Sequence, residues 1–318
     1  MNSSSTQPLL SYAQNGEDVR LLRALGERPR GTYVEIGAND PEEYSISRAF
    51  YERGWSGVVV EPIQSCVDKF RRTRPRDRIV QAVCSTRVGN IPFYEIEVEG
   101  QGNGLSTTDP KAAQDNVELG TDVREYDVQS LGMHQILEGV EHVDFMVIDV
   151  EGAEADVISS LINDVELRPE ILVVEAIHPR IQTPSHEGWE PVLLENGYRT
   201  VTFDGINRFY VHDSADPDLA QLLAIPPNVT DSYVVAKDYA ERLDADKRWN
   251  RMTLTSEFNS LEAAALRAEN LELRIQANAQ RKQAAKLRRR IHTITNSRSY
   301  RAVQKARRSK AKIRKLLK

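Results

Sequence analysis

The chain has few cysteines and no long apolar run. Its two cysteines, Cys66 and Cys84, are too few for a disulfide framework or a thiolate metal site. No stretch approaches the roughly 18 consecutive apolar residues that a bilayer-spanning helix needs. The residues up to Asp18 lack the basic and apolar regions of a secretory signal. We therefore expect a soluble, cytoplasmic protein.

Acidic residues are missing from one end of the chain. From Arg281 onward there are 16 Lys or Arg residues and no Asp or Glu. Residues 1–235 carry 19 Lys or Arg against 39 Asp or Glu, a net charge of −20. Residues 236–318 carry 23 against 8, a net charge of +15, and the two sums give the −5 of the whole chain. This asymmetry predicts two parts with different roles.

A short apolar run precedes a polar turn at Thr32–Asp40 (TYVEIGAND). It is typical of a buried strand that enters a tight loop at Gly37. Gly57–Pro62 (GVVVEP) repeats the pattern about one βα unit later, with Glu61 at the carboxyl end of the strand. Strand, glycine turn, helix, strand and acid form an arrangement that binds a nucleoside, because the acid accepts hydrogen bonds from both ribose hydroxyls.

The turn after Gly37 lacks the second glycine of the dinucleotide fingerprint G-x-G-x-x-G, in which helix N–H groups meet a pyrophosphate. It contains three acids instead, Asp40, Glu42 and Glu43, which repel a diphosphate and tolerate a cation. S-adenosylmethionine carries a sulfonium and an ammonium group and no phosphate, so the turn favours this cofactor. An ordinary turn in a sheet protein is the simpler alternative.

Residues 31–211 alternate strand-like and helix-like segments, which indicates an α/β fold with a mostly parallel sheet and helices on both faces. The expected strands are Thr32–Ile36, Val58–Glu61, Arg78–Val83, Val143–Asp149, Ile171–Glu175, Tyr198–Phe203 and Arg208–His212. The expected helices are Ile46–Arg53, Val67–Thr73, Glu154–Ile162 and Trp189–Asn196. Seven strands that end in an antiparallel hairpin match the Rossmann-like sheet of a class I methyltransferase.

The insert Asn90–Val128 interrupts this alternation. Within it we expect an added strand at Ile91–Val98 and a loop at Gln101–Thr107 (QGNGLST). Loops of that length in compact domains are usually functional.

A seven-residue repeat follows Lys237, in a stretch free of Gly and Pro. The a and d positions of this heptad are Ala263, Asn270, Ala277, Ala284 and Ile291, and Leu266, Leu273, Gln280, Leu287 and Ile294. We expect a methyltransferase-like domain over 1–235, a long helix over 236–296 and a basic tail over 297–318. Self-association of the helix as a coiled coil and a solvated single helix are both left open.

The basic tail has few aromatic residues, so we expect an electrostatic contact and no sequence-specific binding of nucleic acid. Anionic lipids attract such segments by about 1 kcal/mol per Lys or Arg near the surface. This favours a peripheral contact with the inner face of a membrane. Docking onto the acidic domain and a free, solvated tail are the alternatives.

Five motifs together resemble the FkbM-type S-adenosylmethionine-dependent methyltransferase family. In order, they are Tyr12–Asp18 (YAQNGED), Tyr33–Pro41 (YVEIGANDP), Gly54–Pro62 (GWSGVVVEP), Phe145–Glu154 (FMVIDVEGAE) and Gly197–Tyr210 (GYRTVTFDGINRFY). The resemblance covers roughly residues 10–235. It implies an O-methyltransferase that acts on a sugar hydroxyl, in a bacterial surface glycan or a glycosylated natural product. Ser297–Arg301 (SRSYR) is similar to short motifs that follow coiled coils in bacterial surface-polysaccharide enzymes.

The resemblance also implies which residues bind the cofactor. Its cofactor loop and ribose acid fall on Glu35, Gly37, Asn39, Asp40 and Glu61. Gln14 belongs to an N-terminal motif that closes over the site. Many such enzymes hold the adenine amino group with an acid after the third strand, but this chain has Ala82-Val83-Cys84-Ser85 there. Ser85 and backbone groups are therefore expected to take that place.

Catalytic groups are expected at the carboxyl ends of the middle strands, which face the ligand crevice in an open α/β sheet. Asp149 and Glu151 end the fourth strand, and Glu175 and His178 lie at the end of the fifth. His178 is the first choice of base, because a neutral imidazole titrates near physiological pH. Asp149 and Glu175 orient it, or all three bind Mg²⁺. Two structural alternatives are a loop role for His178 and a helix-capping role for Glu151.

Two other functions remain open. An NAD-type oxidoreductase would use the same kind of fold, but the missing glycine and the acidic turn argue against it. A non-catalytic, membrane-associated scaffold would keep the fold without the site. The paired acids Glu35 and Glu61 argue against that reading, since a fold without a cofactor has no need of both.

Overall fold

The computed structural model describes residues 9–98, 102–178 and 183–316. Residues 1–8 of the expected domain, Gln101 of the expected loop and residues 317–318 of the expected tail lie outside the described residues. The chain divides into two compact units, Met1–Ala240 and Glu241–Lys318.

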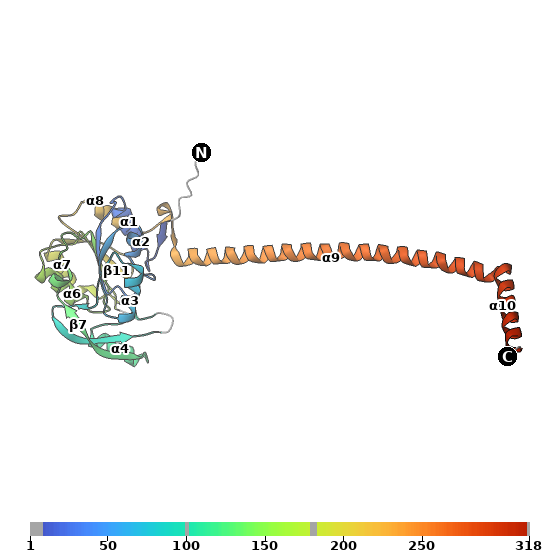
Figure 1. Cartoon of the computed structure of the whole chain (residues 1–318). Coiled ribbons are helices and arrows are strands. Elements are labelled where there is room, and N and C mark those ends of the chain that lie inside the picture. Colours follow the sequence, from blue (N-terminus) through green and yellow to red (C-terminus); the bar gives the residue numbers. More distant parts are fainter. Residues whose placement is uncertain (1–8, 99–101, 179–182, 317–318) are drawn as a thin grey trace. The chain divides into compact units, whose positions relative to one another are not determined.

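Within the described residues, seven strands of the first unit form one sheet (Figure 1). They are β2 (Thr32–Ile36), β3 (Ser56–Val60), β4 (Arg78–Val80), β8 (Phe145–Ile148), β9 (Ile171–Glu175), β10 (Tyr198–Phe203) and β11 (Asn207–His212). The order across the sheet is β10-β11-β9-β8-β2-β3-β4, and β11 runs antiparallel to both of its neighbours. The remaining pairs are parallel. This is the class I methyltransferase order, as the sequence predicts.

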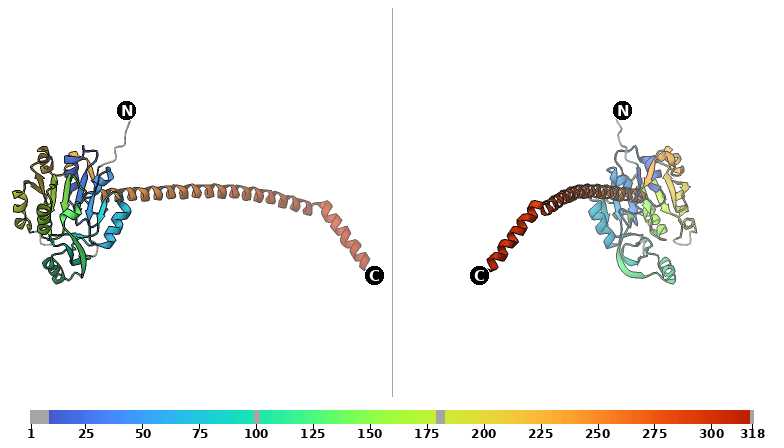
Figure 2. Two further views of the ribbon diagram at one scale, coloured as in Figure 1. Left: turned by 60° about the vertical axis from the view of Figure 1, so that its left-hand side comes forward. Right: turned by 90° about the vertical axis from the view of Figure 1, so that its right-hand side faces the viewer.

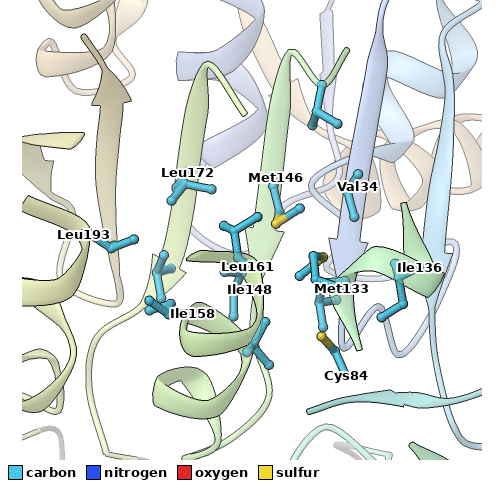
Figure 3. Packing of buried hydrophobic residues seen from close by; sticks show 14 of the residues in the cluster. Val34, Cys84, Met133, Ile136, Met146, Ile148, Ile158, Leu161, Leu172 and Leu193 are labelled. Carbon is cyan, nitrogen blue, oxygen red and sulfur yellow. The ribbon is translucent and has the colours of Figure 1, made fainter. Parts of the chain in front are cut away.

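Helices cover both faces of this sheet because the side chains of each strand alternate between two apolar clusters. Tyr33 and Phe145 belong to one cluster, which also receives side chains from α1 (Glu17–Leu25), α2 (Arg48–Glu52), α3 (Gln64–Thr73) and α8 (Asp218–Ala224). The other cluster is covered by α5 (Met133–Ile136), α6 (Glu154–Asp164) and α7 (Glu190–Glu195). Figure 3 shows it, with Val34, Met146 and Leu172 of the strands beside Leu161 of α6.

The expected strand Arg78–Val83 is divided between two sheets. β4 ends at Val80, and β5 (Val83–Cys84) pairs instead with β7 (Val123–Leu131), which is antiparallel to β6 (Gly89–Ile96). Val83 packs there against Ile63 and Phe93 in a third apolar cluster. The helix α4 (Pro110–Glu118) connects β6 to β7, and these two strands of the insert form a small three-stranded sheet together with β5.

The N-terminal segment is tied to the end of the same unit. β1 (Leu9–Ser11) pairs in parallel with β12 (Tyr233–Val235). Asp18 then accepts hydrogen bonds from the Ser11 hydroxyl and the Tyr12 N–H, both at 2.7 Å. These bonds bend the segment that carries Gln14. Two short 3₁₀ turns complete the unit, η1 (His186–Gly188) and η2 (Val229–Asp231).

Two helices make up the rest of the chain, α9 (Ala236–Asn296) and α10 (Arg298–Leu316), both visible in Figure 2. Large apolar side chains on α9 are well exposed, among them Trp249, Phe258 and Leu261. None of the described helices is both long and apolar enough to cross a membrane. The contact of the basic tail with an anionic membrane stays a prediction.

Candidate functional site

A cavity of about 630 Å³ lies at the carboxyl ends of β2, β3, β8 and β9. That volume is within the range of small-molecule sites. The order of the strands along the chain reverses between β2 and β8, and ligands of open α/β sheets bind at such a point. The walls come from the turns after β2 and β3, from Asp149 and Glu175, and from loop residues 102–108.

The turn after β2 depends on Gly37, which has a φ of +81°, a conformation that favours glycine. The N–H groups of Gly37 and Ala38 both donate to the Val60 carbonyl oxygen, at 3.0 and 3.3 Å. The Asp149 N–H donates to the Ile36 carbonyl oxygen at 3.0 Å. A Cβ atom on residue 37 would lie 1.8 Å from the Asp149 carbonyl oxygen. The missing side chain therefore allows the ends of β2 and β8 to touch.

Glu61 stands directly after β3 and is only 3% exposed. Its two carboxylate oxygens accept the N–H groups of Asn39 and Ile63, each at 2.8 Å. A carboxylate oxygen can accept a second hydrogen bond, so Glu61 can still receive two ribose hydroxyls. Burial raises the pKa of Glu61 to about 7. Hydroxyl donors from a ligand would favour its ionised form.

Glu35 lines the cavity, and its carboxylate is also held by a buried cation. Arg74 directly follows α3, is 2% exposed, and lies 3.9 Å from Glu35 and 4.0 Å from Asp77. It donates to the hydroxyls of Ser45 and Ser47, at 2.7 Å each. The Ser47 hydroxyl in turn donates to Glu35. This network fixes the segment between β2 and α2, which forms one wall of the cavity.

Three carboxylates meet at the ends of β8 and β9. Asp149, Glu151 and Glu175 each offer an oxygen, and these oxygens lie within 4.8 Å of one another. Glu175 is buried, and its Oε2 receives no hydrogen bond. Oxygen ligands of this kind suit a hard divalent cation such as Mg²⁺. The same closeness also lets two of these groups share one proton.

The proton affinities of this cluster are high. Burial, and then the nearby charge of Glu154, raise the pKa of Asp149 to about 7. Burial, together with the charges of Asp149 and Glu151, raises the pKa of Glu175 well above its usual range. We infer that Glu175 keeps its proton at neutral pH while Asp149 is partly ionised. Asp149 is then the stronger candidate for a base.

The ionisable side chains of the described cavity lining are all acidic, apart from the Cys84 thiol and the Tyr44 hydroxyl. Among the described residues that line it there is no Lys, Arg or His. Its acidic lining residues are Glu35, Glu43, Glu61, Asp149, Glu151 and Glu175. Such a lining attracts cations and repels phosphate groups.

Comparison with known families decides the assignment. A profile of the methyltransferase FkbM domain matches residues 35–200, just over half of the 318 residues. The chain belongs to this family. It is an S-adenosylmethionine-dependent methyltransferase, as the sequence motifs predict, and the NAD-type oxidoreductase is set aside.

Solved structures and curated proteins add little. The FkbM chain resembles the putative methyltransferase yhhF from Escherichia coli, at 10% identity over 64% of this chain and 89% of that chain, with a TM-score of 0.33. A TehB-like S-adenosylmethionine-dependent methyltransferase from Corynebacterium glutamicum is 9% identical over 62% of this chain and 87% of that chain, with a TM-score of 0.33. CalO1, a methyltransferase of calicheamicin biosynthesis in its SAH-bound form, is 13% identical over 61% of this chain and 53% of that chain, with a TM-score of 0.31. These scores are too low to support an argument, and the fold assignment follows from the strand order. No curated protein matches the chain.

Most of the residues expected to bind the cofactor do line the cavity of this FkbM domain. They are Gln14, Glu35, Gly37, Asn39 and Glu61. Asn39 has a φ of +50°, which brings its N–H to Glu61. Gln14 lines the same cavity, although it comes from the bent N-terminal segment and not from a strand end.

Two expected cofactor residues are placed elsewhere in the FkbM domain. Asp40 is not part of the described cavity lining, since its carboxylate accepts the Glu42 N–H at 2.7 Å and pairs with Lys69 at 2.5 Å. It stabilises the turn from outside. Ser85 is buried, and its hydroxyl donates to Asp156. The preceding residues 82–84 line the cavity instead.

His178 also lies outside the described lining of the cavity. Glu175 and Ile177 line it, so the alternation of an extended chain places residues 176 and 178 on the other side. Ala176 packs in the apolar cluster, and the His178 side chain is exposed. This placement gives no support to His178 as base or metal ligand. Glu151 takes its place in the carboxylate cluster.

The sequence does not predict which apolar residues line the cavity of this FkbM domain. Ile63 and Phe93 lie at the Glu61 side, and Tyr44 and Ile206 belong to other walls. Phe93 comes from the insert, and its only signal is the apolar alternation of the strand Ile91–Val98. Loop residues 102–108 do line the cavity, and a functional role of that loop stays a prediction.

Proposed function

We propose that this FkbM methyltransferase transfers the methyl group of S-adenosylmethionine to a hydroxyl of an uncharged sugar, in a bacterial surface glycan or a glycosylated natural product. The acidic lining carries the proposal. A cavity with six acids and no cation among its described lining residues favours a sulfonium cofactor and disfavours a phosphorylated acceptor. Neutral sugar hydroxyls remain suitable methyl acceptors, because a hydroxyl can donate a hydrogen bond to a carboxylate.

The cofactor would bind along the β2 and β3 turns. The carboxylate of Glu61 accepts the ribose hydroxyls, and Ile63 and Phe93 supply apolar surface for the adenine ring. The Gly37 turn admits the methionine part close to the backbone. These placements put the sulfonium near the ends of β2 and β8, where Asp149 lies.

Methyl transfer then needs a deprotonated acceptor oxygen in line with the carbon–sulfur bond. The acceptor oxygen attacks the methyl carbon, the carbon–sulfur bond breaks, and the bonding pair stays on sulfur. Asp149 takes the hydroxyl proton, while protonated Glu175 donates to Asp149 and holds it in place. Positioning of this kind supplies about 7–11 kcal/mol of the barrier.

A matched pair of acceptors tests the substrate class. We expect methyl transfer to neutral methyl hexosides, and much less to the same hexosides carrying a 6-phosphate, because the described lining offers a phosphate carboxylates and no Lys, Arg or His. Transfer of a labelled methyl group, followed by mass spectrometry, measures both rates. The product should be an alkali-stable methyl ether. Faster methyl transfer to the 6-phosphate hexoside, or an alkali-labile methyl ester as the product, would overturn the proposal.

A further inference from the structure

One face of α9 carries a stripe of mostly apolar, exposed side chains, interrupted by a few polar residues. The heptad register extends in the N-terminal direction to Trp249 at a and Met252 at d, past the polar Ser256 at a and Asn259 at d. The large apolar side chains at a and d are 52–69% exposed, and they are Trp249, Met252, Leu266, Leu273, Leu287, Ile291 and Ile294. Alanines fill three more a positions, at 263, 277 and 284. An a/d stripe sustained over several heptads is typical of a helix that packs against another helix.

We propose that a second copy of this chain covers the stripe, in a parallel and in-register two-stranded coiled coil. The stripe occurs on a helix of 61 residues, which is about 90 Å long. Only a partner of similar length and complementary charge covers all of it. A second α9 has the same length, and the residues at its e and g positions give it complementary charge.

The charges beside the stripe select the parallel orientation. In a parallel pair each g residue lies near the e residue of the next heptad on the partner helix. Glu262 and Glu269 at g then face the partner's Arg267 and the partner's Arg274. The next g residues are Gln276 and Gln283, opposite Arg281 and Arg288 at e, so four successive g–e pairs contain no like charges.

The antiparallel orientation is disfavoured by the same residues. It would place e beside e, and four successive e positions are arginine: Arg267, Arg274, Arg281 and Arg288. Like charges at such positions repel, and the cost is largest at low ionic strength. The charge pattern therefore distinguishes the two orientations, although the apolar stripe alone does not.

Asn270 at an a position fixes the register. In the in-register pair its amide meets the partner's Asn270 and can hydrogen-bond to it. A shift by one heptad would place each Asn270 against the partner's Ala263 or the partner's Ala277, which offer no side-chain hydrogen bond. Buried polar groups without partners are costly, so the shifted pairs are disfavoured.

Sedimentation of the full chain tests the association. We expect a mass of about 72 kDa, twice the 36.0 kDa of one chain. Leu266→Asp with Leu273→Asp changes two d positions and should give a single chain. Leu271→Asp with Ile275→Asp is the matched control, because those side chains are equally exposed on the same helix but lie at b and f. It should remain a dimer. A wild-type mass near 36 kDa, or equal dissociation of both variants, would overturn the proposal.

A cysteine cross-link tests orientation and register, in a background in which Cys66 is replaced by serine. Leu273→Cys should form a disulfide-linked dimer under mild oxidation, since equal d positions meet only in the parallel, in-register pair. Leu271→Cys at position b should stay uncrosslinked. Absence of the Leu273→Cys cross-link in a chain that sediments as a dimer would contradict the parallel pair. Neither experiment depends on the proposed acceptor.

Discussion

Replacing Asp149 with asparagine is expected to lower kcat about 10²–10⁴-fold, the usual contribution of a general base. Asparagine keeps the size of the side chain and cannot take the hydroxyl proton. Binding of S-adenosylhomocysteine should change little in comparison, because the Gly37 turn and Glu61 supply most of the expected cofactor contacts. Steady-state rates at saturating cofactor, together with calorimetric titration, separate the two effects.

Glu175→Gln is the matched control for this change. If Glu175 holds its proton at neutral pH, glutamine imitates its protonated form and still donates to Asp149. We therefore expect the variant to keep most of its turnover at pH 7. His178→Ala should also keep most of it, since that side chain is exposed and outside the described cavity lining. A large loss with His178→Ala and none with Asp149→Asn would contradict the assignment of the base.

The dependence of kcat on pH checks the same role. Below its pKa Asp149 already holds a proton and cannot accept another. The rate should therefore rise with pH through a midpoint near 7, the value to which burial raises the pKa of Asp149. Prior treatment with a chelator should leave the rate unchanged. Loss of activity on chelation, restored by Mg²⁺, would instead assign Asp149, Glu151 and Glu175 to a metal.

Gly37→Ala is expected to have the largest effect on folding. A Cβ atom there would lie 1.8 Å from the Asp149 carbonyl oxygen, and the backbone is in the left-handed region. The strained φ costs about 1–2 kcal/mol, and relief of the overlap adds about 1–3 kcal/mol. The free energy of unfolding in urea should fall by about 2–5 kcal/mol in total.

Gly54→Ala isolates the steric part of that loss. Gly54 has a φ of +92°, but nothing lies within 4 Å of a Cβ atom at this position. It should cost only the backbone strain, and binding of S-adenosylhomocysteine should persist. Equal destabilisation by the two substitutions would mean that the contact between the ends of β2 and β8 is not required.

The sequence predicts β2 and β9 to the residue, since both are short apolar runs that end in a polar turn. It does not predict β7, because Val128 and Ser130 are its only buried residues and the apolar alternation is absent. Arg78–Val83 reads as one strand, but its last part pairs with the insert. Pairing across that distance cannot be read from a local pattern.

The site is predictable where it follows directly from a strand. Glu61 is found because an acid after a buried strand has few structural roles. Arg74 is not found, since it stands in a basic run that looks like a solvated helix face, and only the fold brings it to Glu35. His178 has suitable chemistry, but the alternation of the chain after Glu175 turns it away from the cavity.

Calorimetric titration tests the central claim most directly. The wild-type protein and Glu61→Gln are each titrated with S-adenosylhomocysteine, and the wild-type protein is also titrated with NADH. The claim is that the cavity binds a nucleoside without a diphosphate. S-adenosylhomocysteine should bind the wild-type protein saturably, and Glu61→Gln should weaken it about 10–100-fold, through loss of hydrogen bonds to a charged group worth about 1.5–3 kcal/mol. NADH should give no binding heat. Saturable binding of NADH, or unchanged affinity of Glu61→Gln for S-adenosylhomocysteine, would contradict the account.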